Sequence, residues 1–228
     1  MPSAAETFWQ LTLDLRQAAA LDAERRFAHL ASAPPATLFA FLGHYRLFTQ
    51  RYISDLALLV SRMPEGPFRS ILGDILAEEL GHGAYEQDHL RLYDRFLESC
   101  GAPPVGRLPS DVLDELRDAV LVRSVPYAIG LRGMGGECMC ALYLAALHTA
   151  CSVNPYIVRH RETIDWTFWD IHLGEVEGHH DALLRASVTS MLEASPESGP
   201  EVAAGFQHGT ESWLRFWDTV PSSMPTGL

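Results

Sequence analysis

The sequence predicts an all-α fold, a single-domain helical bundle of about seven helices. Apolar residues recur at helical spacing over most of the chain, and no stretch of useful length alternates apolar and polar residues as a β-strand would. At 228 residues, with 47% hydrophobic and 20% charged residues, the chain is long enough for one well-packed domain. We place this domain at residues 1–220 and expect residues 221–228 to form a flexible tail.

Proline- and glycine-containing breaks separate the helical stretches. Ala33-Pro34-Pro35 ends the first, because proline disfavours helix before it and suits the first turn after it. Met63-Pro64-Glu65-Gly66-Pro67 ends the second, and Asn154-Pro155 ends the apolar helix in the middle of the chain. The expected helices cover residues 6–33, 36–62, 68–99, 110–122, 126–153, 164–192 and 202–220.

The charge balance excludes several classes of partner. A formal net charge of −12 argues against nucleic acid and anionic membranes, since phosphate contacts need clustered Lys and Arg. No apolar run reaches the roughly 18 residues of a membrane span, and the N-terminus lacks the basic and apolar regions of a secretory signal. The four cysteines lack the spacing of a disulfide framework. We expect a cytoplasmic protein with a small-molecule substrate and no nucleic-acid or membrane partner. Whether it forms a homodimer is left open by the sequence.

Residues 78–89 place carboxylates and imidazoles within the expected helix 68–99. At about 100° per residue, four of them fall within one quadrant of that helix. These four are Glu79, His82, Glu86 and His89. Carboxylate and imidazole together suit iron, manganese or zinc. Taken alone, the stripe is equally typical of a solvated face with polar pairs three and four residues apart.

A second stretch favours metal binding. His172, Glu175 and His179 follow i, i+3, i+7 spacing and so share a face of the expected helix 164–192. Glu137 enters an otherwise apolar run, where a lone carboxylate is costly to bury unless it is paired or binds a metal. Di-iron sites in helical bundles are built by several helices that each present carboxylate or imidazole to one interior point. The two stretches and Glu137 together therefore indicate such a site.

These motifs resemble those of the haem-oxygenase-like di-iron oxidases, a branch of the superfamily that includes the TenA thiaminases and the pyrroloquinoline-quinone synthase. The resemblance covers most of the chain: an aromatic second helix, Glu79-Leu80-Gly81-His82-Gly83 followed by His89, an apolar helix entered by a glutamate, and a late helix with histidines seven apart. It implies a haem-oxygenase-like bundle that acts as an O2-dependent non-haem di-iron oxidase or oxygenase. The implied cofactor is Fe(II), two per chain, with O2 as co-substrate. The implied substrate is a small amine, amino acid or fatty acid of natural-product biosynthesis.

The ligands that the resemblance implies are matched by order and approximate spacing, with two places open. Where such enzymes have an aspartate on the third ligand-bearing helix, this chain has Val176, which cannot bind a metal. Glu175 is the preferred substitute, and a slipped register through Glu177 and His180 is the alternative. The imidazole ligand on the first ligand-bearing helix is either His82 or His89. The other expected ligands are Glu79, Glu137, His172, Glu175 and His179.

Two rival functions stay open. Cys138 directly follows Glu137, so a metal-free member of the superfamily could act as a thiaminase-like hydrolase with a cysteine nucleophile, or as a cofactorless oxidase. Val176 keeps open a non-catalytic helical binding protein. A di-iron site also needs an apolar wall that excludes water and orients the substrate. The residues expected to form it are Tyr45, Phe48, Tyr52 and Trp169.

Overall fold

The computed structural model describes residues 2–104, 110–173 and 175–220, with the side chains of residues 175–181 excepted. All regular secondary structure in these ranges is helical, which confirms the predicted all-α class. Each of the seven expected stretches contains at least one helix, and a short further helix, α8, follows Asn154. The α-helices are α1 (Ala4–Phe27), α2 (Pro35–Arg62), α3 (Pro67–Glu79), α4 (His89–Ser99), α5 (Asp111–Val122), α6 (Val125–Ala128), α7 (Gly135–Ser152), α8 (Pro155–His160), α9 (Thr167–His172), α10 (Glu175–Ala194) and α11 (Gly199–Asp218).

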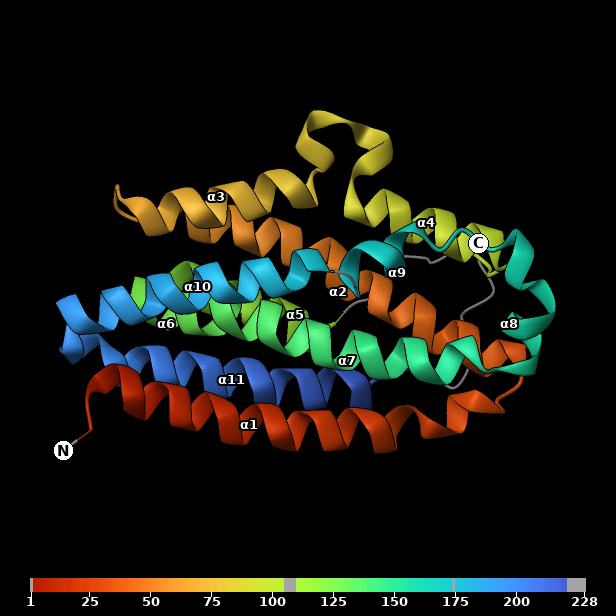
Figure 1. Cartoon of the computed structure of the whole chain (residues 1–228), viewed down its shortest axis with the longest axis horizontal. Coiled ribbons are helices and arrows are strands. Elements are labelled where there is room, and N and C mark those ends of the chain that lie inside the picture. The colour runs from red at the N-terminus through yellow and green to blue at the C-terminus, as the bar shows by residue number, and fades with distance from the viewer. Residues whose placement is uncertain (1, 105–109, 174, 221–228) are drawn as a thin grey trace.

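The long helices run side by side along the molecule (Figure 1). α1 and α11 lie along its lower side and pack against α7, while α3 and α4 lie along its upper side and pack against α2. Aromatic side chains join the lower helices: Phe27 of α1 meets Trp217 of α11 edge to face at 4.8 Å between ring centroids, and Trp217 stacks on Tyr143 of α7. Such pairs add to the stability that area burial already gives.

Local sequence signals set the helix starts. Pro35 and Pro67 occupy the first positions of α2 and α3, where their fixed φ suits the helix and the missing N–H is not needed. Ser3 caps α1 in a reciprocal capping box with Glu6. Asp88 caps α4, since its side chain accepts from the backbone N–H of Leu90 at 2.9 Å. The cap makes His89 the first residue of α4.

The expectation of one continuous helix over residues 68–99 is wrong. α3 ends at Glu79 and α4 begins at His89, and the 3-10 turns Gly81–Gly83 and Tyr85–Gln87 protrude between them (Figure 1). The three consecutive residues 81–83 have φ values of 63°, 50° and 86°. A run of left-handed conformations cannot continue a right-handed helix, so the helix stops before it. The predicted stripe of four ligands on one helical face is lost with it.

Two other expected helices are also interrupted. The apolar helix starts as α6, continues as a π-helical segment (Ile129–Met134) and becomes α7. The expected single helix over residues 164–192 is wrong, because α9 ends at His172 and α10 begins at Glu175. Each interruption lies beside a predicted ligand: Glu137 is three residues past the π-helical segment, and His172 is the last residue of α9. Interruptions of this kind are frequent at functional sites.

No single helix of the described ranges is both long and apolar enough to span a membrane. Two consecutive helical segments, Val125–Ser152 and Pro155–Thr163, have the length and composition of a membrane span only when they are taken together, and the chain bends by 72° between them. The longer segment carries α7, most of whose inner face is buried against the other helices of the bundle.

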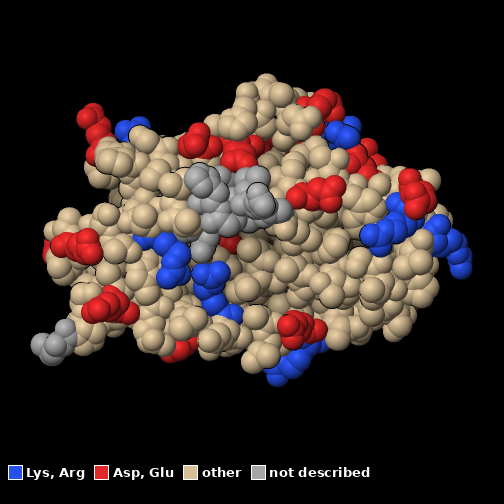
Figure 2. Space-filling model, in the orientation of Figure 1, with Lys and Arg blue, Asp and Glu red and all other residues tan. Residues whose placement is uncertain are grey.

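Acidic side chains are frequent along the upper edge of the face in Figure 2, where α3, α4 and the turns between them lie. Residues 74–98, which form this edge, include seven acidic and two basic residues. Glu86 on the second turn and Glu98 on α4 are exposed, and Arg91 lies within 3.6 Å and 3.2 Å of them respectively. The edge keeps an excess of negative charge.

Candidate metal centre

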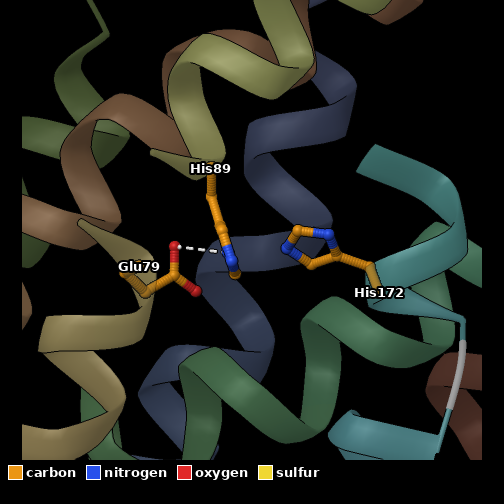
Figure 3. Close-up of side chains that lie close together, drawn as sticks. All are labelled: Glu79, His89 and His172. Atoms are coloured by element: carbon orange, nitrogen blue, oxygen red, sulfur yellow. Dashed lines mark ion pairs between the residues drawn. The ribbon is translucent and has the colours of Figure 1, made fainter. Parts of the chain in front are cut away.

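Glu79, His89 and His172 bring their side chains together from α3, α4 and α9 (Figure 3). One carboxylate oxygen and two imidazole nitrogens all lie within 4.8 Å of one another. With bonds of about 2.1 Å, as zinc forms to nitrogen and oxygen, two ligand atoms of one ion are about 4 Å apart at most. Small side-chain movements therefore suffice to close the three atoms around one ion.

The ring of His172 is oriented by its own helix. Its Nδ1 donates a hydrogen bond of 2.8 Å to the carbonyl oxygen of Phe168, one turn earlier. Since a carbonyl only accepts, this bond fixes the tautomer with the lone pair on Nε2, as in many metal-binding histidines. The ring of Phe168 stacks on the imidazole at 4.0 Å between centroids. His172 is thus held in the form that binds a metal through Nε2.

His89 is buried against Glu79. Its Nδ1 lies 3.2 Å from Oε2 of Glu79 (Figure 3), yet within the described residues it has no hydrogen bond of good geometry. Burial by itself lowers the pKa of His89, but the interaction with Glu79 outweighs it and the pKa is raised. A buried nitrogen in this position is one that a metal ion would satisfy.

Glu137, on the first turn of α7, is buried and close enough to Glu79 and His89 for both to affect its pKa. Burial, together with the negative charge of Glu79, raises the pKa of Glu137 to about 7. The hydroxyl of Tyr52 donates a hydrogen bond to Oε1 of Glu137. Two buried carboxylates repel each other unless a proton or a cation lies between them. The donor set, two carboxylates and two imidazoles, therefore fits a bound metal.

The structure separates the two candidate histidines of residues 78–89. It brings His89 to Glu79 and His172, whereas His82 is exposed on the first 3-10 turn with φ 50°. Glu86 is exposed on the second turn. In this arrangement His89 supplies the imidazole of the group, and His82 and Glu86 lie outside it.

The remaining expected ligands belong to α10. Glu175 is its first residue and His179 follows one turn later, but their side chains lie outside the described residues. The same holds for the slipped alternative, Glu177 and His180. Their roles as ligands stay predictions.

The four aromatic residues expected to form the substrate wall are all buried: Tyr45, Phe48, Tyr52 and Trp169. Tyr52 touches the predicted ligand Glu137, and Phe48 packs between Tyr52 and Trp213. A groove of about 610 Å³ lies elsewhere, between residues 63–71, 125–129 and 183–198, and none of the four lines it. Their role as a substrate wall stays a prediction.

A buried ion pair of Asp55 and Arg132 lies behind Tyr52, and it was not identified from the sequence. Asp55 is 0% and Arg132 2% exposed, and Nε of Arg132 donates to Oδ2 of Asp55 at 3.0 Å. Asp55 is a charged residue in the aromatic second helix, but no local pattern links it to Arg132, 77 positions away. The signal in the sequence was only that each is a charged residue in an apolar stretch.

Comparison with known proteins adds a family and a fold. A family model described as iron-containing redox enzyme matches residues 40–214. A crystal structure of a CADD-like protein of unknown function from Nostoc punctiforme PCC 73102 is similar, with a TM-score of 0.75 and 23% identity over 96% of this chain and 99% of that chain. A second crystal structure with the same description has a TM-score of 0.69 and 21% identity over 94% of each chain. None of the curated proteins matches. At these identities the two structures support the fold alone.

Proposed function

The chain belongs to the family of iron-containing redox enzymes, and we propose that it is an O2-dependent non-haem di-iron oxidase or oxygenase. One observation carries the proposal. Glu79, His89 and His172 come from three separate helices, and their ligand atoms lie within 4.8 Å of one another. Carboxylate with imidazole is the ligand set of non-haem iron, and the family description favours iron over zinc or manganese.

The residues of the chain would hold the metals and shape their surroundings. Glu79, His89 and His172 would hold one ion, and Glu137 with Glu175 and His179 would complete a site for two. Ferrous ions bound there supply the reduction of O2 and the oxidation of a nearby substrate bond. The bond from His172 to Phe168 keeps the imidazole in its ligand tautomer, and the buried aromatic side chains around the centre exclude water.

The substrate that we propose is a small amine, amino acid or fatty acid, used in natural-product biosynthesis. The acidic upper edge supports the first class, because negative potential concentrates cations and repels carboxylate anions. The same field would raise the local concentration of Fe²⁺ near the centre. An amine is therefore the first substrate class to test.

Anaerobic iron loading followed by exposure to O2 tests the proposal. The protein is incubated with Fe(II) without oxygen, desalted, and its iron counted; we expect two ions per chain. The matched control is the double variant His89→Ala/His172→Ala, which removes two ligand atoms of the group. Oxygen uptake is then measured with small amines, amino acids and fatty acids in turn. Iron uptake no greater than that of the double variant would end the di-iron proposal.

A further inference from the structure

We infer that Tyr52 is a positioning residue of the metal centre, which holds the carboxylate of Glu137 in place and is itself held by the buried pair of Asp55 and Arg132. The inference rests on the proposed function, because it takes Glu137 as a metal ligand. It assigns a role to a buried ion pair that contributes no ligand.

The first step is the contact between Tyr52 and Glu137. The phenol hydroxyl donates to Oε1 of Glu137, and both side chains are buried. Hydrogen bonds to an ionised carboxylate are among the strong ones in proteins, and strength grows where water is excluded. With Oε1 engaged by Tyr52, Oε2 is the oxygen left to face a metal. The bond therefore selects the orientation of the carboxylate.

The second step is the space that the Tyr52 ring needs. A Cβ at Gly136, the residue before Glu137, would lie 2.4 Å from Cε2 of Tyr52. No side chain fits there, so the ring can pass directly over the backbone that leads into Glu137 only because this residue is glycine. The ring and the backbone of α7 thus fix each other's position at the point where the ligand leaves the helix.

The third step is the contact that holds the Tyr52 ring in place, which comes from the ion pair of Arg132 and Asp55. Arg132, in the π-helical segment, donates to Oδ2 of Asp55 through Nε at 3.0 Å and through Nη2 at 2.5 Å. Its guanidinium carbon lies 5.1 Å from the ring centroid of Phe48 and 5.9 Å from that of Tyr52. Cations at about 6 Å or less from an aromatic centroid are attracted to its face. Asp55 is three residues after Tyr52 on α2, so one helix carries both the aromatic ring and the carboxylate that holds Arg132 against it.

The ion pair is better explained by positioning than by stability. Desolvation of two buried charges offsets most of their attraction, and well-packed apolar residues often replace such pairs without loss. A planar guanidinium held over Phe48 and Tyr52 does what an apolar side chain would not do: it fixes the orientation of the rings beneath it. The ring of Tyr52 in turn fixes Glu137.

Cobalt binding tests the inference without using enzyme turnover. Co(II) is titrated into the full chain without oxygen, and its visible absorption reports the ligand geometry. Tyr52→Phe removes only the oxygen that holds Glu137. We expect a folded protein whose Co(II) binds about 10-fold or more weakly, as with other residues that orient a ligand, and with an altered spectrum. Tyr143→Phe is the matched control: its hydroxyl also donates to a carboxylate, that of Asp22, at 2.9 Å, and both spectrum and affinity should stay as in the unchanged protein.

Arg132→Lys tests the contact of Arg132 with the Tyr52 ring separately. Lysine keeps a positive charge opposite Asp55 but lacks the planar group, so a Co(II) spectrum between those of the unchanged protein and Tyr52→Phe is expected. If Tyr52→Phe does not fold, Arg132→Lys decides alone: a Co(II) spectrum that differs from that of the unchanged protein supports the inference, and an identical spectrum overturns it. Tyr52→Phe with unchanged affinity and spectrum, while the unchanged protein binds Co(II), would overturn the inference and leave the proposed function standing. An unchanged protein that binds neither Co(II) nor Fe(II) would overturn both.

Discussion

Nδ1 of His89 lies 3.2 Å from Oε2 of Glu79, although the two residues are ten positions apart. On a continuous helix they would be separated by about 15 Å along the axis. They meet because the chain leaves the helix after Glu79, forms two 3-10 turns, and starts α4 at His89. The turns supply none of the three grouped side chains, yet they set the distance between two of them.

Replacing His89 by alanine should abolish the binding of at least one iron. The change removes a nitrogen of the buried group and the imidazole that lies 3.2 Å from Glu79. His82→Ala is the control, because His82 is exposed on the turn and should be dispensable. Iron counted after anaerobic loading checks both. Full loading of His89→Ala with loss in His82→Ala would show that the other histidine is the ligand.

Replacing Gly81 by alanine should weaken both folding and metal binding. Gly81 has φ 63°, and a Cβ there would lie 2.5 Å from the backbone carbon of Gln87. We expect a loss beyond the roughly 1–2 kcal/mol of a left-handed residue, since the second turn must also shift. Gly83→Ala is the control, with φ 86° and nothing within 4 Å of its Cβ. Urea unfolding and iron content measure the two effects; equal losses in both variants would contradict a role for the close contact.

Replacing Glu175 by alanine should remove one iron, whereas Glu177→Ala should leave loading nearly intact. The reason is the spacing of His172, Glu175 and His179, which favours Glu175 as the substitute for the aspartate that Val176 replaces. Iron content and the Co(II) spectrum of both variants test it. The reverse result would establish the slipped register through Glu177 and His180.

Replacing Cys138 by alanine should leave iron content and O2 uptake unchanged. Cys138 is 3% exposed within α7, and a buried thiol in apolar surroundings is inert rather than nucleophilic. Activity is compared with and without complete chelation of the metal. Turnover that survives chelation but disappears in Cys138→Ala would replace the di-iron proposal with the metal-free hydrolase.

The parts of the fold that local chemistry determines were predictable. Pro35 and Pro67 begin α2 and α3 because proline fits the first helical turn, and the apolar periodicity gave the approximate extents of α2 and α11. The break at residues 81–83 was not predictable in the same way. The apolar spacing on both sides continues a helical pattern, and glycine tolerates helical as well as left-handed backbone. Only packing of the two turns against each other decides between them.

Some residues of the candidate site were likewise predictable from the sequence, and others were not. Glu79 and His172 were singled out because carboxylate and imidazole share one face of an expected helix, and Glu137 because a lone carboxylate is costly in an apolar run. The sequence left His82 and His89 equal, since both fall on one stripe of an ideal helix. The contacts of Tyr52 with Glu137 and of Arg132 with Asp55 join residues 85 and 77 positions apart, and such pairs leave no local pattern to read.

The π-helical segment Ile129–Met134 has a consequence for the divergence of this chain from its relatives. Its i→i+5 hydrogen bonds accommodate one more residue than an α-helical turn, so the segment acts as a single-residue insertion absorbed without a loop. Deleting one residue there would restore the α-helical turn and leave α7, with Glu137, on the same face relative to α6. A relative without the wider turn should therefore show a one-residue gap before its glutamate, and that glutamate should still occupy the place of Glu137 in the structure.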